Sequence, residues 1–157
     1  MLDDRLIDTL QFECRPSRAG WCPLRLVDSM QAPAPAALRN LLDGLPPRRL
    51  PAAWLALQQR QSFATEEEGF DFSPDTATPQ TPSVTVYDYI RSTVIGRPAF
   101  ERLMTRFFAA LVQAVHDQQD PLADAPWWPA LASGLSAGVG GDGADDAGHP
   151  SPHSEAE

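Results

Sequence analysis

The sequence predicts a small, mainly α domain in which four or five helices surround one long amphipathic helix. Apolar residues in the second half of the chain recur every three or four positions over several turns, and shorter segments elsewhere repeat this spacing. In addition, one ambiguous stretch, residues 20–27, could form a strand, but a lone strand needs a partner and the sequence offers no convincing second one. Together these observations favour helices as the main element.

The long helix is expected at residues 98–119. Pro98 suits a first helical position, because its missing N–H would have no intrahelical partner there. Asp120 precedes Pro121, and a residue before proline is pushed out of the helical region, so the helix is expected to end here. At about 100° per residue the apolar side chains fall on one stripe. The stripe consists of Phe100, Leu103, Met104, Phe107, Phe108, Leu111, Val112 and Val115.

Shorter helices are expected in the N-terminal half. Residues 2–13, 36–45 and 51–62 each place leucines or other large apolar residues at helical spacing. Residues 20–27 alternate loosely and could form a strand, but Pro23 argues against a central position in a sheet. Because no partner strand is evident, an extended segment packed on helices is the preferred interpretation.

The middle of the chain is expected to interrupt the helical part. Residues 66–82 combine prolines, a glycine and a run of acids with Phe70 and Phe72, which predicts a linker or mobile loop. Ser83 can cap a helix over residues 84–95. The β-branched residues of that segment make a strand the competing interpretation.

The predicted organisation is a single domain with one interruption and a tail. Residues 1–65 form its N-terminal helical part, and residues 66–82 form the acidic, proline-rich linker or loop. Residues 83–135 complete the domain as a helical hairpin followed by a tryptophan-containing segment. Residues 136–157 are acidic and glycine-rich, which predicts a disordered tail.

Composition narrows the classes of partner. The net charge of −9 and the pI of about 4.6 argue against nucleic acid, which requires a basic footprint, although Arg48 and Arg49 leave a local basic patch open. Every basic residue is arginine, so a lysine nucleophile or Schiff base is excluded. The N-terminus lacks the apolar run of a signal peptide, and no stretch approaches the length of a membrane span. We therefore expect a cytoplasmic protein, or one of the host cytoplasm or nucleus if the chain is viral.

Few residues offer catalytic chemistry. Cys14 and Cys22 are too few for a disulfide scaffold or, by themselves, for a zinc site, and two reduced thiols are preferred over a bridge. His116 lies near the end of the long helix, where a cation interacts favourably with the helix dipole. A pair of Cys14 and His116 would be the available nucleophile and base, but nothing in the sequence brings them together. We predict no enzyme activity, no metal and no cofactor.

The remaining features favour contacts with other proteins. Trp127 and Trp128 could close over the core or anchor a partner, and Phe70 and Phe72 could form a short binding motif or pack onto the domain. The stripe of the long helix could be plain core or a surface shared with a partner or a second copy. The candidate partner-binding residues are Phe100, Leu103, Met104, Phe107, Phe108, Leu111, Phe70, Phe72, Trp127 and Trp128.

The predicted function is non-enzymatic protein–protein interaction, as an adaptor, an accessory subunit or a chaperone-like factor. In bulk composition the chain is similar to bacterial secretion chaperones, a likeness that transfers no residues. The alternative is a factor of a large DNA virus, either a subunit of an assembly complex or a host-interaction protein. The absence of lysine and the Ser/Thr-Pro sites at Ser73, Thr78, Thr81 and Ser151 favour this alternative.

Overall fold

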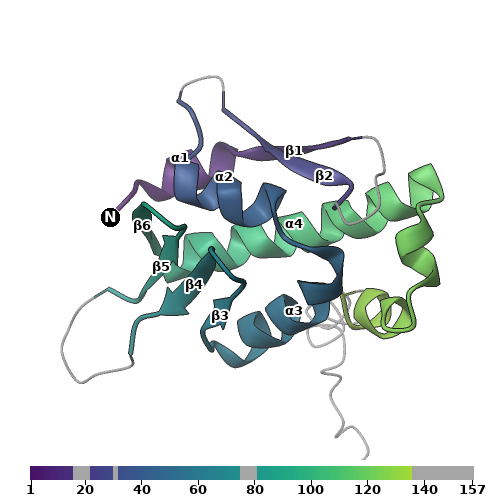
Figure 1. Ribbon diagram of the computed structural model, residues 1–157. Helices are drawn as coiled ribbons and strands as arrows, with labels where there is room; N and C mark the ends of the chain where they lie inside the picture. The colour runs from purple at the N-terminus through teal and green to yellow at the C-terminus, as the bar shows by residue number, and fades with distance from the viewer. Residues whose placement is uncertain (16–21, 30–31, 75–80, 136–157) are drawn as a thin grey trace, which may run out of the picture.

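The part of the chain that the structure describes is a mixture of helices and two antiparallel sheets, so the prediction of a mainly α domain is wrong (Figure 1). The computed structural model describes residues 1–15, 22–29, 32–74 and 81–135. The predicted tail at 136–157 lies outside the described residues. The elements are α1 (Asp4–Thr9), β1 (Gln11–Cys14), β2 (Leu24–Val27), α2 (Ala36–Asp43), the 3₁₀ turn η1 (Pro47–Arg49), α3 (Leu50–Gln59), β3 (Phe63–Ala64), β4 (Gly69–Phe72), β5 (Ser83–Tyr87), β6 (Ser92–Gly96), α4 (Arg97–Gln118) and the 3₁₀ turn η2 (Pro121–Asp124).

The long helix predicted at 98–119 is confirmed as α4, which crosses the middle of the molecule in Figure 1. Pro98 lies in its first turn, and Gln119 ends it in the left-handed conformation with a φ of 50°. Its polar side also holds the fold together. The Arg106 guanidinium donates to the carbonyl oxygens of Leu10 at 2.7 Å and Ile7 at 3.0 Å, which ties the end of α1 to α4.

The helix predicted over residues 2–13 is a short helix followed by a strand. Asp3 caps α1 by accepting the N–H of Arg5, and Leu10 leaves the helical region. The following strand β1 pairs with β2 in an antiparallel sheet of two strands, so the extended segment near residues 20–27 has the partner that the sequence did not reveal. The pair is stabilised by packing on α4, where the rings of Phe12 and Phe107 lie 5.4 Å apart.

The segment predicted as a helix over 84–95 is the hairpin of β5 and β6, and part of the predicted 66–82 loop is strand β4. These strands and β3 form an antiparallel sheet in the order β3-β4-β5-β6. Val84 pairs with Ile95 and with Phe72, so β-branched and aromatic side chains face one another across the ladder. Residues 75–80 of the predicted loop lie outside the described part of the chain.

The predicted helices at 36–45 and 51–62 are confirmed as α2, which ends two residues earlier than predicted, and α3, which begins one residue earlier and ends three residues earlier. A further helix begins at Trp128 and continues to the last described residue, Leu135. One buried apolar cluster extends along the chain from Ile7 to Leu135 and includes residues of the helices and of both sheets, but none of η1. Among the described residues, no helix is long and apolar enough to cross a membrane.

Candidate functional site

The six residues of the long helix that were candidates for partner binding all lie in the core. None exposes more than 1% of its surface, and their contacts are with this chain. The ring of Phe108 lies 5.1 Å from that of Trp54 on α3, and the ring of Phe100 lies 5.2 Å from that of Phe70 on β4. The stripe therefore joins α3 and the four-stranded sheet to α4. These residues are Phe100, Leu103, Met104, Phe107, Phe108 and Leu111.

The four other candidates pack onto the same core. Phe70 is buried, and Phe72 is half-buried with its ring 6.2 Å from that of Phe100. Trp128 is buried, and Trp127 is half-buried with its ring 6.2 Å from that of Trp128. The two tryptophans thus close over the helical core, one of the two arrangements that the sequence left open.

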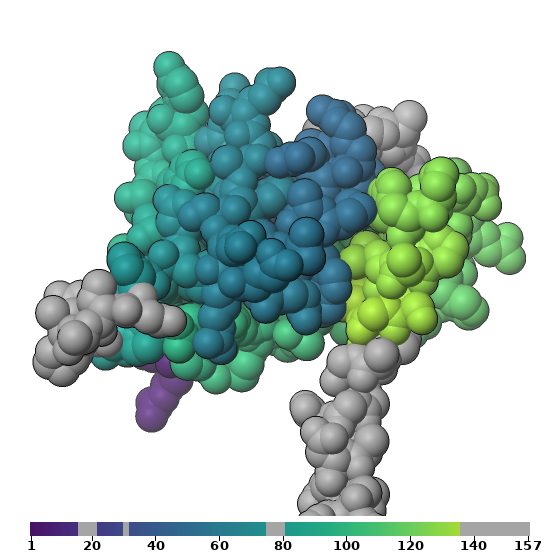
Figure 2. All heavy atoms as spheres, turned by 90° about the horizontal axis from the view of Figure 1, so that it is seen from below, coloured from purple at the N-terminus to yellow at the C-terminus, as the bar shows by residue number. Residues whose placement is uncertain are grey.

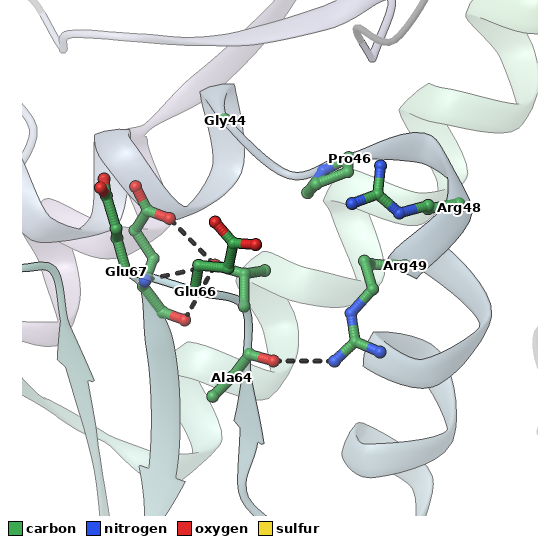
Figure 3. Close-up of a pocket in the computed structure, with 9 residues that line it drawn as sticks. Gly44, Pro46, Arg48, Arg49, Ala64, Glu66 and Glu67 are labelled. Atoms are coloured by element: carbon green, nitrogen blue, oxygen red, sulfur yellow. Dashed lines mark hydrogen bonds between the residues drawn. The ribbon is translucent and has the colours of Figure 1, made fainter.

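A polar hollow lies between η1 and the turn that joins β3 to β4 (Figure 3). Its volume is about 630 Å³, and its two rims carry opposite charge. Arg48 and Arg49 form the basic rim, whereas three consecutive glutamates form the acidic rim. Among the described residues, no ion pair joins the two rims. The lining residues are Gly44, Pro46, Arg48, Arg49, Ala64, Thr65, Glu66, Glu67 and Glu68.

Contacts within the chain fix part of each rim. The Arg49 guanidinium donates to the carbonyl oxygen of Ala64 at 2.7 Å and lies 5.2 Å from the centre of the Phe63 ring. On the acidic rim the Thr65 hydroxyl donates to the Glu68 carboxylate at 3.0 Å, and the Thr65 N–H donates to the Glu68 carbonyl oxygen at 2.8 Å. The turn is therefore held in shape, while Arg48 makes no hydrogen bond or ion pair to another described residue.

The turn between β5 and β6 exposes two large apolar side chains. Tyr89 is 83% exposed and Ile90 is 78% exposed, the highest values among the large apolar residues described. The Asp88 carboxylate fixes this turn by accepting the N–H of Ile90 at 2.8 Å and the N–H of Arg91 at 2.6 Å. Asn40 on α2 donates to the same carboxylate at 2.7 Å. These bonds hold the pKa of Asp88 below its usual value, with the N–H of Arg91 the largest cause.

The two turns lie side by side at one end of the four-stranded sheet. Gly69, directly after the β3–β4 turn, pairs with Tyr87, directly before the β5–β6 turn. Figure 2 shows the turns as neighbouring teal projections at the upper edge of the molecule, with a notch between them and the blue segment of α2 and η1. We call this surface the hairpin end and define it as residues 65–68 and 88–91. The hollow lies beside it.

A buried thiol and a buried carboxylate lie elsewhere, near the start of β2. Burial raises the pKa of Cys22 to about 11, opposed in part by a hydrogen bond from the Leu24 N–H and by the charge of Arg15. The charge of Asp120 also raises the pKa of Cys22. One oxygen of Asp120 accepts the N–H of Leu122, and the other is buried without a hydrogen bond from a described residue. At neutral pH the Cys22 thiol is therefore protonated and is a poor nucleophile.

The two cysteines are expected to differ in reactivity towards a thiol reagent. Both are free, Cys14 is exposed and Cys22 is fully buried. At pH 8 the native protein should release one equivalent of thionitrobenzoate rapidly, and the second at least about a hundredfold more slowly because so little thiolate forms. Unfolding in guanidinium chloride should make both reactive. Cys14→Ser should remove the rapid phase, and two rapid equivalents from the native wild type would contradict the assignment.

His116 is exposed on the last turn of α4. Its Nδ1 lies 3.4 Å from an Asp117 carboxylate oxygen, and Gln113 donates to that same oxygen at 2.8 Å. No hydrogen bond between described residues brings His116 to Cys14. Likewise, no group of three or more potential metal ligands occurs within the described residues.

Comparisons of the chain with protein-family models, with curated proteins and with solved structures found no match. The hairpin end combines exposed apolar residues and charge on two fixed turns. It was not among the predicted sites, because its residues had been assigned to a loop and to a helix.

Proposed function

We propose that this chain is a non-catalytic protein-binding factor, of the adaptor or accessory-subunit kind, that contacts its partner through the hairpin end. The observation that carries this proposal is the exposure of Tyr89 and Ile90, at 83% and 78%, on a turn whose backbone is fixed. Scattered exposed apolar residues are ordinary on protein surfaces. Here two adjacent ones project from the tip of a hairpin, while the aromatic residues of α4 are buried.

The geometry of the turn supports this role. Asp88 accepts two main-chain N–H groups and one amide N–H of Asn40, so binding would have little backbone entropy to remove. Tyrosine is enriched among the residues that dominate binding energies, since its ring offers large contact area at low entropic cost. A rigid turn with a tyrosine at its tip suits insertion into a recess of another protein.

Photo-crosslinking tests this proposal. With p-benzoylphenylalanine in place of Tyr89, irradiation should give a discrete crosslinked protein adduct in an extract of cells that naturally make the protein. The matched control is the same substitution at Leu55, which is 54% exposed on α3. We expect the adduct at position 89 to exceed that at position 55 about tenfold and to weaken with Ile90→Ser, as hot-spot contacts do. Equal yields at both positions would count against the hairpin end.

A further inference from the structure

We propose that the partner of the hairpin end is a second copy of this chain, related by a two-fold axis that passes near the hollow. This inference rests on the proposed function and names its partner. The observation behind this proposal is that two rims of opposite charge, which form no ion pair with each other among the described residues, lie beside an exposed apolar tip. A two-fold interface uses the same surface on both copies, so that surface must complement itself.

The charges of the hollow meet this requirement. In Figure 3 the Arg48 guanidinium and the Glu66 carboxylate lie on opposite sides of the opening. Rotation by 180° about an axis between them places the Arg48 of one copy opposite the Glu66 of the other. It does so twice in each dimer. Among the described residues these charges form no ion pair across the hollow within one copy, whereas the two-fold contact brings them together between copies, where it also removes water and strengthens the attraction.

The rest of the hairpin end fits the same arrangement. Tyr89 and Ile90 project next to the acidic turn, so a second copy docked over the hollow would cover them. In this arrangement the charged pairs lie near the two-fold axis and the apolar tips lie beside them, so the contact combines charge complementarity with burial of apolar area. Repulsion between two chains of charge −9 opposes association. It is a long-range effect that salt screens beyond about 10 Å at 0.1 M, whereas the paired rims act at contact.

Charge exchange between two variants tests the two-fold arrangement. Arg48→Glu places a carboxylate on the basic rim, which then has no net charge because Arg49 remains, and the double variant Glu66→Arg/Glu67→Arg gives the acidic rim a net positive charge. None of these three side chains bonds to another described residue, and all are exposed, so both variants should fold, which circular dichroism checks. Light scattering after size exclusion should give twice 17.1 kDa for the wild type and 17.1 kDa for each variant alone.

An equimolar mixture of the two variants should again give the dimer mass, because position 48 of each copy then faces a charge of opposite sign at position 66 of the other. Each variant alone should dimerise at least about tenfold more weakly than the wild type, since like charges meet at two contacts. A monomeric wild type at every concentration up to the highest soluble one, or a mixture that stays monomeric, would overturn the second copy as partner. If the second copy is overturned in this way but position 89 crosslinks to a different protein, the proposed function still stands. Variants that remain fully dimeric would overturn the two-fold arrangement.

Discussion

Replacing Phe100 by alanine is expected to lower the free energy of unfolding by about 3–5 kcal/mol, as is usual for deleting a fully buried ring. Phe100 is 0% exposed, and its ring touches those of Phe70 at 5.2 Å and Phe72 at 6.2 Å. It therefore carries much of the packing between α4 and β4. Removing it leaves a cavity that two neighbouring rings cannot fill without moving the strand.

Urea denaturation followed by circular dichroism measures this loss. Leu55→Ala is the matched control, because Leu55 also lies on a helix but is 54% exposed, and it should change the stability by no more than about 0.5 kcal/mol. If Phe100→Ala stayed within about 1 kcal/mol of wild type, the packing of α4 against β4 would be incorrect.

A related prediction concerns the substitution Phe107→Asp. A carboxylate at that buried position should unfold the domain, so any loss of partner binding by it would say nothing about an interface.

The long helix was predictable because local signals agreed with the tertiary fold. The apolar spacing of α4 persists over its whole length, and Pro98 and Asp120-Pro121 mark its ends. For α2 and α3 the signals were shorter but still consistent, with Gly44 and Pro46 after one and Pro51 at the start of the other. For α4 and α2 the buried face follows from the periodicity, whereas on α3 Leu55 is 54% exposed, and Ala53 and Ala56 are buried instead.

The strands were not predictable in the same way, because their pattern is short and ambiguous. Val84 and Tyr87 are three residues apart, which suggested one helical face, yet in β5 they lie on opposite faces of the sheet. What decides for the strand is pairing with β4 and β6, an interaction between segments far apart in the sequence. The β-branched residues of this segment correctly indicate a strand, whereas the spacing of Val84 and Tyr87 favours the wrong interpretation, a helix.

The candidate site depended on these missed strands. Tyr89 and Ile90 are exposed because Asp88 turns the chain between two strands, and a helix would have placed Ile90 on its apolar side. An aspartate followed by two residues and flanked by β-branched runs is a turn signal that could have revealed the hairpin. The hollow has no local signal, since Arg48 and Glu66 belong to different elements that only the folded chain brings together.

Replacing Gly69 by alanine is expected to lower the free energy of unfolding by about 3 kcal/mol, at the upper end of the cost of overpacking. A Cβ atom there would lie 2.3 Å from the carbonyl oxygen of Phe63 and 2.5 Å from the phenol oxygen of Tyr87. The first contact is with main chain, so β3 would have to move away from β4. Gly134→Ala is the control, because its Cβ would meet only Trp54 Nε1 at 3.8 Å, and alanine within a helix should be neutral or up to about 1 kcal/mol more stable.

A double variant separates the two clashes at Gly69. Tyr87 pairs with Gly69 across the ladder and covers it, an arrangement in which a ring compensates for the missing side chain. In a Tyr87→Ala background the phenol clash is gone, but the Phe63 carbonyl remains 2.3 Å from the new Cβ. Gly69→Ala should therefore still cost at least about 2 kcal/mol in that background. If the cost vanished, the strand β3 would be free to shift, and glycine would be required only for the ring of Tyr87. If the cost persisted, close approach of two backbones would be the reason that β4 begins with glycine.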